Sequence, residues 1–145
     1  MSEIEPRPVP EITGYGVPFW AAARAHRLVL QHCPRCDRFQ HFPRPWCTTC
    51  LNDQMDFVNA AGTGTIYSST TVRRTPNPSF TGRLPYVLAL VDLDEGVRFY
   101  TNIVGCDPVE VHIGQRVRVC FEDIDAEHTV VLFTPDTRDE TDTEA

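Results

Sequence analysis

Four cysteines in one short segment constrain this chain more than any other feature. They form two Cys-x-x-Cys pairs, Cys33 with Cys36 and Cys47 with Cys50, separated by ten residues. Each pair can form a tight turn that directs two thiolates at one point, and two such turns supply the four sulfurs of a closed tetrahedral zinc site. Disulfides or free thiols are the alternative interpretations, and they fit poorly with a chain that shows no sign of secretion. We therefore expect a structural Zn²⁺.

The first residues give no indication of export. The segment MSEIEPRPVPEITG is acidic and rich in proline, and it lacks the basic start and apolar run of a signal peptide. No stretch approaches the roughly eighteen apolar residues of a membrane span. The sequence thus predicts a cytoplasmic protein without a membrane segment, in which cysteines are more often metal ligands and buried thiols than disulfides.

The charge pattern limits the possible functions. The net charge is −7 and the chain contains no lysine, which excludes Schiff-base lysine chemistry and a P-loop lysine. An acidic total also argues against a general nucleic-acid binder, whose affinity comes largely from phosphate neutralisation. The cysteine segment is nevertheless a local basic patch. Between residues 24 and 50, one acid stands against five arginines: Arg24, Arg27, Arg35, Arg38 and Arg44.

The order of apolar and turn-forming residues predicts a mainly β protein. Residues 86–93 are nearly all apolar, 116–122 alternate strictly, and 94–96 form a hairpin turn signal. A short helix is expected where Pro18 precedes three alanines. Five strands after the cysteine segment fit a small Greek-key barrel of the OB type, with an SH3-like barrel or a sandwich fragment as alternatives. The expected parts are an extended arm (1–17), an N-terminal helix (18–27), a rubredoxin-like zinc ribbon (28–54), a five-stranded OB-type barrel (55–135) and a disordered acidic tail (136–145).

Two glycines, Gly62 and Gly64, precede the first barrel strand. Glycines at this spacing also occur in phosphate-binding loops, but neither a lysine nor a predicted helix follows these two. A bulge or a sharp bend that leads into a coiled strand is the better interpretation.

A helix this short is stable only when it packs on other residues, and two aromatic side chains at its start are expected to make that contact. Phe19 and Trp20 open the predicted helix. Packing on the chain's own core is expected for one of them, and a groove on a partner protein is the alternative for the pair. With the basic patch, they form a candidate docking set of six residues: Phe19, Trp20, Arg24, Arg35, Arg38 and Arg44.

No catalytic constellation emerges from the remaining chemistry. Cys106 and Cys120 have no histidine or other base placed beside them by the sequence, and both are better explained as buried thiols. His32 and His41 flank the cysteine pairs, but four sulfurs already complete a tetrahedron. We therefore predict no catalytic residue and no enzyme activity of the chain's own.

The succession of motifs resembles a known family. The chain contains PFWAAARAHR, then LVLQHCPRC and FPRPWCTTC, then GTGTIYS, LPYVLALVDLDEGVRFYTNIVGCDP and IGQRVRVCFED. This order, over residues 18–134, is similar to acyl-CoA-associated OB-fold proteins with an N-terminal rubredoxin-like zinc ribbon, the DUF35 family. Asp37 and Leu51 depart from the pattern, because the residue after such a cysteine pair is usually glycine with positive φ. Asp tolerates that conformation, whereas Leu adopts it poorly.

The resemblance implies an accessory role. Such proteins are usually small partner subunits of thiolase-superfamily enzymes, thiolases or retro-aldolases, and sometimes of MaoC-type hydratases, in lipid, aromatic or steroid degradation. The ribbon and helix would dock on the enzyme, which would form a hetero-oligomer with this chain. The barrel would help to frame the channel for the CoA thioester.

Two other functions remain open at the level of sequence. A single-strand nucleic-acid module would use Tyr67, Phe99 and Tyr100 as stacking aromatics. A direct acyl-CoA-binding protein would use a proline-rich loop whose arginine forks suit phosphate groups. Its candidate residues are Arg73, Arg74, Phe80 and Arg83.

Overall fold

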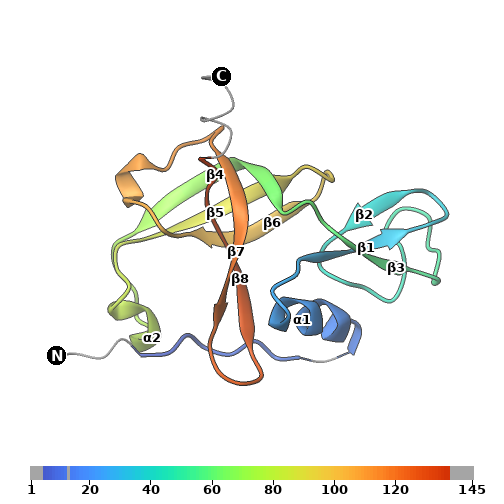
Figure 1. Ribbon diagram of the computed structural model, residues 1–145, viewed down its shortest axis with the longest axis horizontal. Coiled ribbons are helices and arrows are strands. Elements are labelled where there is room, and N and C mark those ends of the chain that lie inside the picture. Colours follow the sequence, from blue (N-terminus) through green and yellow to red (C-terminus); the bar gives the residue numbers. More distant parts are fainter. Residues whose placement is uncertain (1–4, 13, 138–145) are drawn as a thin grey trace.

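The computed structural model describes residues 5–12 and 14–137, and it consists mainly of β-strands (Figure 1). A short helix precedes a small three-stranded sheet, and a closed five-stranded barrel follows. The predicted fold class is therefore confirmed. None of the helices in the described ranges is long and apolar enough to cross a membrane.

The cysteine segment forms a small antiparallel sheet with the order β2-β1-β3. Its strands are β1 (Val29–Cys33), β2 (Arg38–Gln40) and β3 (Asp56–Asn59). The sequence placed residues 56–59 in the barrel, but β3 pairs with β1 instead, with Leu30 opposite Val58. The sequence of a four-residue strand does not indicate which of two sheets it joins, so the partner of β3 can be read only from the observed strand pairing.

Helix α1 (Val17–Arg24) connects the sheet to the barrel, and the 3-10 helix η1 (Gly14–Gly16) precedes it. Pro18 lies in the first turn, where its missing N–H is not needed. The helix ends three residues before the predicted end at residue 27, because His26 adopts φ 57° and turns the chain toward β1. In Figure 1, α1 lies between β1 and the lower end of β8.

The barrel closes in the order β4-β5-β6-β8-β7. The strands are β4 (Thr63–Val72), β5 (Tyr86–Leu93), β6 (Arg98–Ile103), β7 (Arg116–Asp123) and β8 (Thr129–Pro135). The short helix α2 (Pro78–Thr81) lies between β4 and β5, and the 3-10 helix η2 (Pro108–Glu110) lies between β6 and β7.

One seam of the barrel differs from the others. Strands β6 and β8 are parallel and share a single register pair, Ile103 with Phe133. The backbone N–H of Val104 donates to the carbonyl of Phe133 at 2.8 Å. By contrast, β7 and β8 are antiparallel and pair from Val117 to Asp123.

The main core fills the barrel and extends toward the helix. The nearly all-apolar sequence of β5 predicts a strand buried on both faces, but in the structure only every second side chain is buried. The core continues through Phe99 and Phe133 to Phe19 of α1 and Leu30 of β1. Barrel, helix and ribbon sheet therefore share one apolar core.

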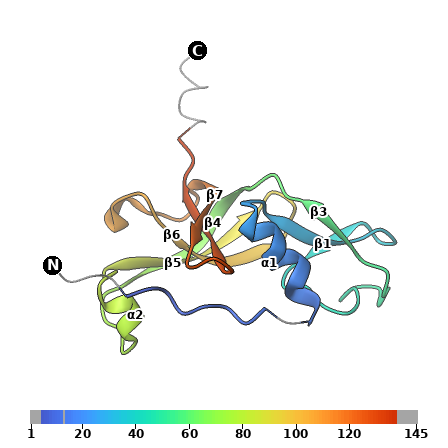
Figure 2. The same ribbon diagram turned by 60° about the horizontal axis from the view of Figure 1, so that its bottom comes forward.

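The N-terminal arm runs along one side of the molecule from α2 to α1 (Figure 2). Residues 1–4 and 13 of the predicted arm lie outside the described residues. At the other end, Asp136 is 8% exposed, and its N–H donates to the carbonyl of Arg116 at 3.0 Å. The remainder of the predicted acidic tail, 138–145, is outside the described residues.

The glycines before β4 sit where the chain passes close to its neighbours. Gly62 has φ +81°, and a Cβ there would lie 2.8 Å from Val119. A Cβ on Gly64 would lie 2.6 Å from the carbonyl oxygen of Asp92. A shift in the pairing of β4 with β5 follows between Ile66 and Ser68. These features match the predicted bend and bulge rather than a phosphate loop.

The substitution Gly64→Ala should destabilise the barrel by about 3 kcal/mol, because the added methyl group overpacks against the backbone of β5. Urea unfolding followed by circular dichroism measures this as a lower midpoint with an unchanged slope. Gly16→Ala is the matched control, since φ is −80° there and the nearest atom lies 3.4 Å from the new Cβ. The control should lose less than about 1 kcal/mol; equal midpoints for the two variants would contradict the packing argument.

Candidate metal centre and adjoining sites

The four cysteines of the two pairs converge on one point. Their sulfur atoms all lie within 4.8 Å of one another. Sγ of Cys33 is 3.5 Å from Sγ of Cys50, and Sγ of Cys36 is 3.6 Å from Sγ of Cys47. Metal–sulfur bonds of about 2.3 Å in a tetrahedron place the sulfurs about 3.8 Å apart. The donor set and its spacing therefore fit a structural metal ion.

N–H groups around Cys33 and Cys47 favour the thiolate forms that a metal requires, whereas burial raises the pKa of Cys36 to about 12. The backbone N–H groups of Thr49 and Cys50 lie 3.4 and 3.5 Å from Sγ of Cys47, and they lower the pKa of that thiol. Burial acts to raise the pKa of Cys33, but hydrogen bonds, including one from the Asn52 side chain, outweigh it and lower the pKa to about 6. Both groups are thus prepared to lose their protons to a bound cation.

The residue after each cysteine pair adopts the left-handed conformation. Asp37 has φ 58° and Leu51 has φ 65°. Their N–H groups close the turns by donating to the carbonyls of Cys33 at 2.8 Å and Cys47 at 3.0 Å. Leu51 is 71% exposed, so its side chain extends into solvent while its backbone carries the strain. The second turn therefore has the same geometry as the first, despite the poor fit of leucine to it.

Two glutamines hold the loop between the cysteine pairs, a role that no local sequence pattern indicates. The buried amide of Gln31 donates to the carbonyl of Arg44 at 2.7 Å and accepts from the Arg44 N–H at 2.9 Å. Gln40 donates to the carbonyl of Trp46 at 3.1 Å and accepts from the N–H of Thr48 at 3.0 Å. These bonds fix the approach to the second cysteine pair.

The two flanking histidines make other contacts. Nε2 of His32 lies 2.7 Å from a carboxylate oxygen of Asp37. His41 belongs to an aromatic cluster, with its ring centroid 4.4 Å from that of Phe99 and 5.0 Å from that of Phe19. Burial lowers the pKa of His41 to about 4.

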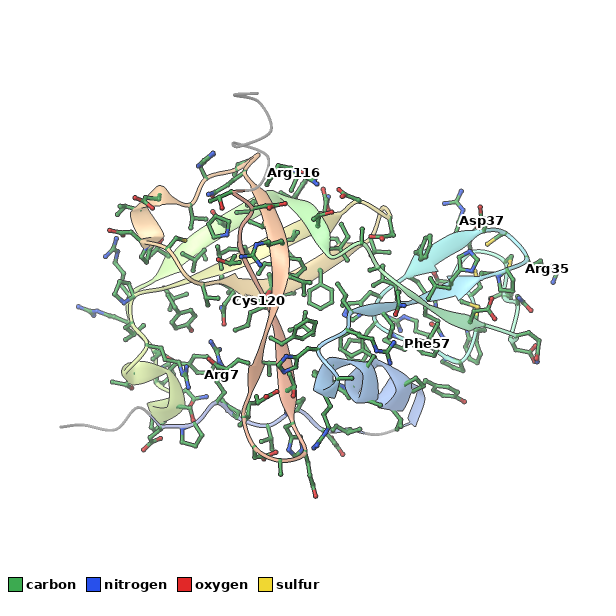
Figure 3. All side chains as sticks on the ribbon, viewed as in Figure 1. Arg7, Arg35, Asp37, Phe57, Arg116 and Cys120 are labelled. Atoms are coloured by element: carbon green, nitrogen blue, oxygen red, sulfur yellow. The ribbon has the colours of Figure 1, made fainter. Side chains whose placement is uncertain are left out.

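The predicted docking residues divide into two groups. Phe19 is 2% exposed and packs in the core, so it cannot form part of a docking surface, whereas Trp20 is half-buried. The predicted docking arginines are all exposed, and Arg35 lies at the tip of the ribbon, far from the barrel (Figure 3). Exposed apolar side chains join them on the ribbon, including Phe42 and Trp46. The sequence did not single out these two residues, because nothing local marks an apolar side chain as exposed.

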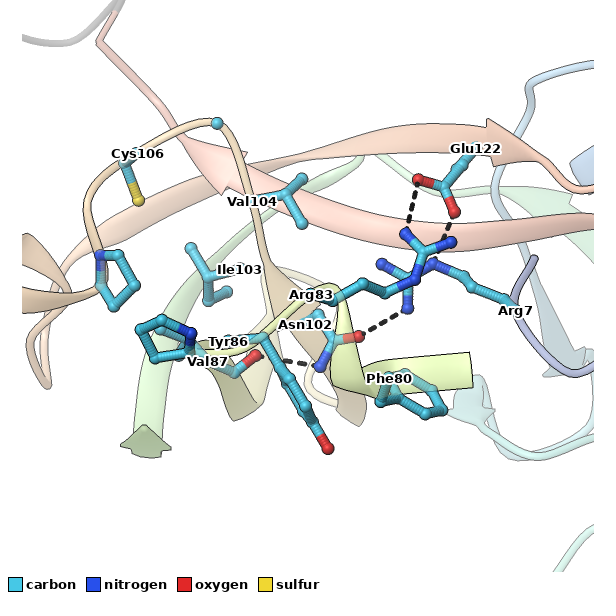
Figure 4. A pocket seen from close by; sticks show the side chains of 13 residues that line it. Arg7, Phe80, Arg83, Tyr86, Val87, Asn102, Ile103, Val104, Cys106 and Glu122 are labelled. Carbon is cyan, nitrogen blue, oxygen red and sulfur yellow. Dashed lines mark hydrogen bonds and ion pairs between the residues drawn. The ribbon is translucent and has the colours of Figure 1, made fainter. Parts of the chain in front are cut away.

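A second site lies at the side of the barrel, where the arm meets β6 and β7 (Figure 4). It is a cavity of about 250 Å³ with two guanidinium groups beside one carboxylate. Arg7 donates to Glu122 at 2.5 Å and to the amide oxygen of Asn102 at 3.0 Å. Arg83 lies 3.8 Å from Glu122 and donates to the carbonyl of Glu5 at 3.2 Å. Two cations against one anion leave the site net positive.

This cavity brings together only part of the predicted acyl-CoA set. Phe80 and Arg83 line it, whereas Arg73 and Arg74 are exposed and lie outside its lining. Arg7 was missed, because its partner Glu122 is 115 positions away and no local pattern connects them.

Two other groups of candidates can be placed. Burial raises the pKa of both Cys106 and Cys120, so neither thiol is activated as a nucleophile. Among the proposed stacking aromatics, Phe99 is buried, and the Arg98 guanidinium covers Tyr67 at 3.5 Å from the ring centroid. Of these rings, Tyr100 is the one left open, at 64% exposure.

Protonation of His41 should couple stability to pH. Its folded pKa of about 4 lies below its ordinary value of 6.5. The stabilisation is therefore complete above pH 6.5 and is lost as the pH falls toward 4. Between pH 7.5 and 5 the wild type should lose about 2 kcal/mol more unfolding free energy than His41→Phe, which keeps a ring against Phe99. Urea unfolding at both pH values measures this difference, and equal losses in the two proteins would refute it.

Comparisons with known proteins match both parts of the chain. Residues 20–56 match the family described as the ChsH2 rubredoxin-like zinc ribbon domain, and residues 57–122 match the ChsH2 C-terminal OB-fold domain. A solved chain from a structure called "Ltp2-ChsH2(DUF35) aldolase" is 40% identical with a TM-score of 0.79, covering 87% of this chain and 98% of that one. A DUF35 domain-containing scaffold protein of Methanothermobacter thermautotrophicus is 31% identical over 68% of this chain and 74% of its own length.

A longer relative is also similar. The probable enoyl-CoA hydratase alpha subunit of Thermomonospora curvata is 40% identical over 89% of this chain. The chain spans 40% of the length of that relative. The two family matches and the similar solved chain lead to the same conclusion. The chain belongs to the ChsH2 (DUF35) family, in which a rubredoxin-like zinc ribbon precedes an OB-fold domain.

Proposed function

We propose that the protein is a non-catalytic accessory subunit of a thiolase-superfamily enzyme, a thiolase or retro-aldolase, that acts on acyl-CoA thioesters. The observation that carries this proposal is its likeness to the ChsH2 chain of an Ltp2-ChsH2(DUF35) aldolase, which it matches over 98% of that chain's length. The subunit would bind the enzyme as a hetero-oligomer and would activate or stabilise it. A CoA thioester would meet this chain through the complex.

The chemistry of the described residues supports a non-catalytic role. The two cysteines outside the cluster, Cys106 and Cys120, both have raised pKa values. His26 and His128 are each held by a nearby carboxylate, Asp123 and Asp125. Among the described residues no hydrogen bond joins either thiol to a histidine, so these groups do not form the pair of nucleophile and adjacent base that acyl transfer requires.

The ribbon supplies features that suit docking. Phe42 and Trp46 are 44% and 51% exposed, and exposed arginines flank them on the same module. Aromatic residues and arginine are the residue types most enriched at protein interfaces. In this proposal, the metal fixes the loop that carries both aromatics.

The metal is proposed to be Zn²⁺, held by the four clustered cysteines. Substituting Cys47 with serine should abolish zinc binding and unfold residues 28–52, because structural zinc contributes on the order of 10–16 kcal/mol in small modules. Elemental analysis should find one zinc per chain in the wild type and in the control Cys120→Ser, which lies outside the cluster. Purified protein that contains neither zinc nor iron would refute the assignment, and iron alone would refute zinc.

Association with the enzyme should depend on the same site. Affinity-tagged wild-type chain, expressed in its native host, should retain a thiolase-superfamily enzyme identified by mass spectrometry. Cys47→Ser should lose it, because the docking loop is no longer fixed, and Cys120→Ser should retain it. Recovery of a hydratase instead would favour the second candidate partner, which the likeness to a probable enoyl-CoA hydratase alpha subunit suggests. Recovery of neither enzyme class would contradict an accessory role.

Direct acyl-CoA binding is a second candidate function. It is favoured by the net positive cavity of Arg7, Arg83 and Glu122, because guanidinium groups suit phosphate and carboxylate ligands. Calorimetry with a CoA thioester distinguishes the two functions. Heat with the chain alone supports direct binding, whereas heat only after the partner enzyme is added supports binding through the complex.

A further inference from the structure

A second cavity lies where helix, ribbon and barrel meet. Its volume is about 480 Å³, and it shares no lining residue with the Arg7 cavity or the cysteine cluster. Three parts of the chain contribute to it, so it exists only in the assembled fold. The lining residues that matter here are Trp20, His41, Phe42, Phe99, Tyr100 and Val130.

The cavity is lined mainly by aromatic rings. The centroids of Trp20 and Phe42 are 6.3 Å apart, with their planes inclined at 49°. Phe42 is 44% exposed and Tyr100 is 64% exposed, so part of this aromatic surface faces solvent. A flat apolar molecule that covered these rings would remove apolar area from water and would gain stacking contacts.

One polar group lies in this apolar wall without a partner. The ring of His41 stacks on Phe99 at an interplanar angle of 20°, and its Nδ1 is buried with no hydrogen-bond partner among the described atoms. Because Nδ1 is buried, it cannot bond to a ligand in the cavity. Nε2 is not sealed in this way and has no hydrogen-bond partner among the described residues, so it is the ring nitrogen available to a molecule in the cavity that His41 lines. A hydroxyl group suits either tautomer, since it can both donate and accept.

The charge of the cavity indicates a neutral ligand. Arg98 is its one charged lining residue, and its guanidinium is already bound to Asp92 at 2.7 Å and stacked over Tyr67. His41 is uncharged at neutral pH, because burial lowers its pKa. No lining charge is therefore free to pair with a ligand ion.

We propose that this cavity binds a neutral, flat ring molecule that carries one hydroxyl group, with the hydroxyl hydrogen-bonded to His41. The volume falls within the usual range of about 300–1,000 Å³ for small-molecule sites, and so does the pattern of apolar walls with one placed polar group. The site is lined by this chain alone, but Phe42 also belongs to the proposed docking surface, so the probes are tested on the chain without its partner enzyme.

Two commercially available probes test the idea: 2-naphthol, and naphthalene as the same ring without the hydroxyl. Each is titrated into the ¹⁵N-labelled full chain and followed by NMR. Saturable shifts are expected at the Trp20 indole N–H and the Tyr100 amide. The probe 2-naphthol should bind about fivefold more tightly than naphthalene, as expected for one neutral hydrogen bond.

Three variants locate the site. Tyr100→Glu places a charge at the exposed edge of the cavity and should weaken both probes at least tenfold. His41→Phe keeps the ring stack and should remove the preference for 2-naphthol. Trp46→Phe is the control, since Trp46 is 51% exposed and lies outside the lining; it should leave both affinities unchanged. If His41→Phe does not fold, Tyr100→Glu and the pair of probes still decide the question.

Three results would overturn the proposal. One is the absence of saturable shifts, and another is equal affinity in the wild type and Tyr100→Glu. The third is a set of Tyr100 shifts that follow protein concentration without any probe, which would assign the cavity to contact with a second copy of the chain.

Discussion

The contact of Phe19 with His41 and Phe99 is the interaction on which the whole structure depends. It joins one residue from the helix, one from the ribbon loop and one from the barrel, with ring centroids between 4.4 and 6.2 Å apart. The ribbon sheet is too small to bury a core of its own, so its orientation relative to the barrel comes from the shared core, in which this cluster joins all three parts. The metal holds the ribbon together, and the ring cluster holds the ribbon in place.

Stability is thus divided between two kinds of interaction. Inside the ribbon, four sulfurs and two glutamine side chains fix the backbone at specific points. In the barrel and helix, apolar burial acts over many side chains at once. This division leaves the outer aromatic side chains of the ribbon, Phe42 and Trp46, free to face solvent without loss of local order.

Sequence reasoning succeeded where the determining residues are close together. The four cysteines lie within eighteen positions, and the alternation that places Val117 of β7 in the core is local. It failed for contacts between residues that are far apart in the sequence and for burial that depends on such contacts. The rings of Phe19 and Trp20 are adjacent in sequence, and only the packed structure selects the one that is buried. The contact of Arg7 with Glu122 and the pairing of β3 with β1 likewise depend on partners that no local pattern identifies.

The single parallel contact between β6 and β8 has a mechanical consequence. Strands β6 and β8 are joined by a single register pair. Local separation of two strands costs least where the fewest hydrogen bonds break, so the barrel is most easily deformed between β6 and β8. Ile103 and Val104 beside this contact border the Arg7 cavity, and Val131 of β8 borders the aromatic cavity. Whatever occupies either cavity would therefore brace the barrel along its weakest line.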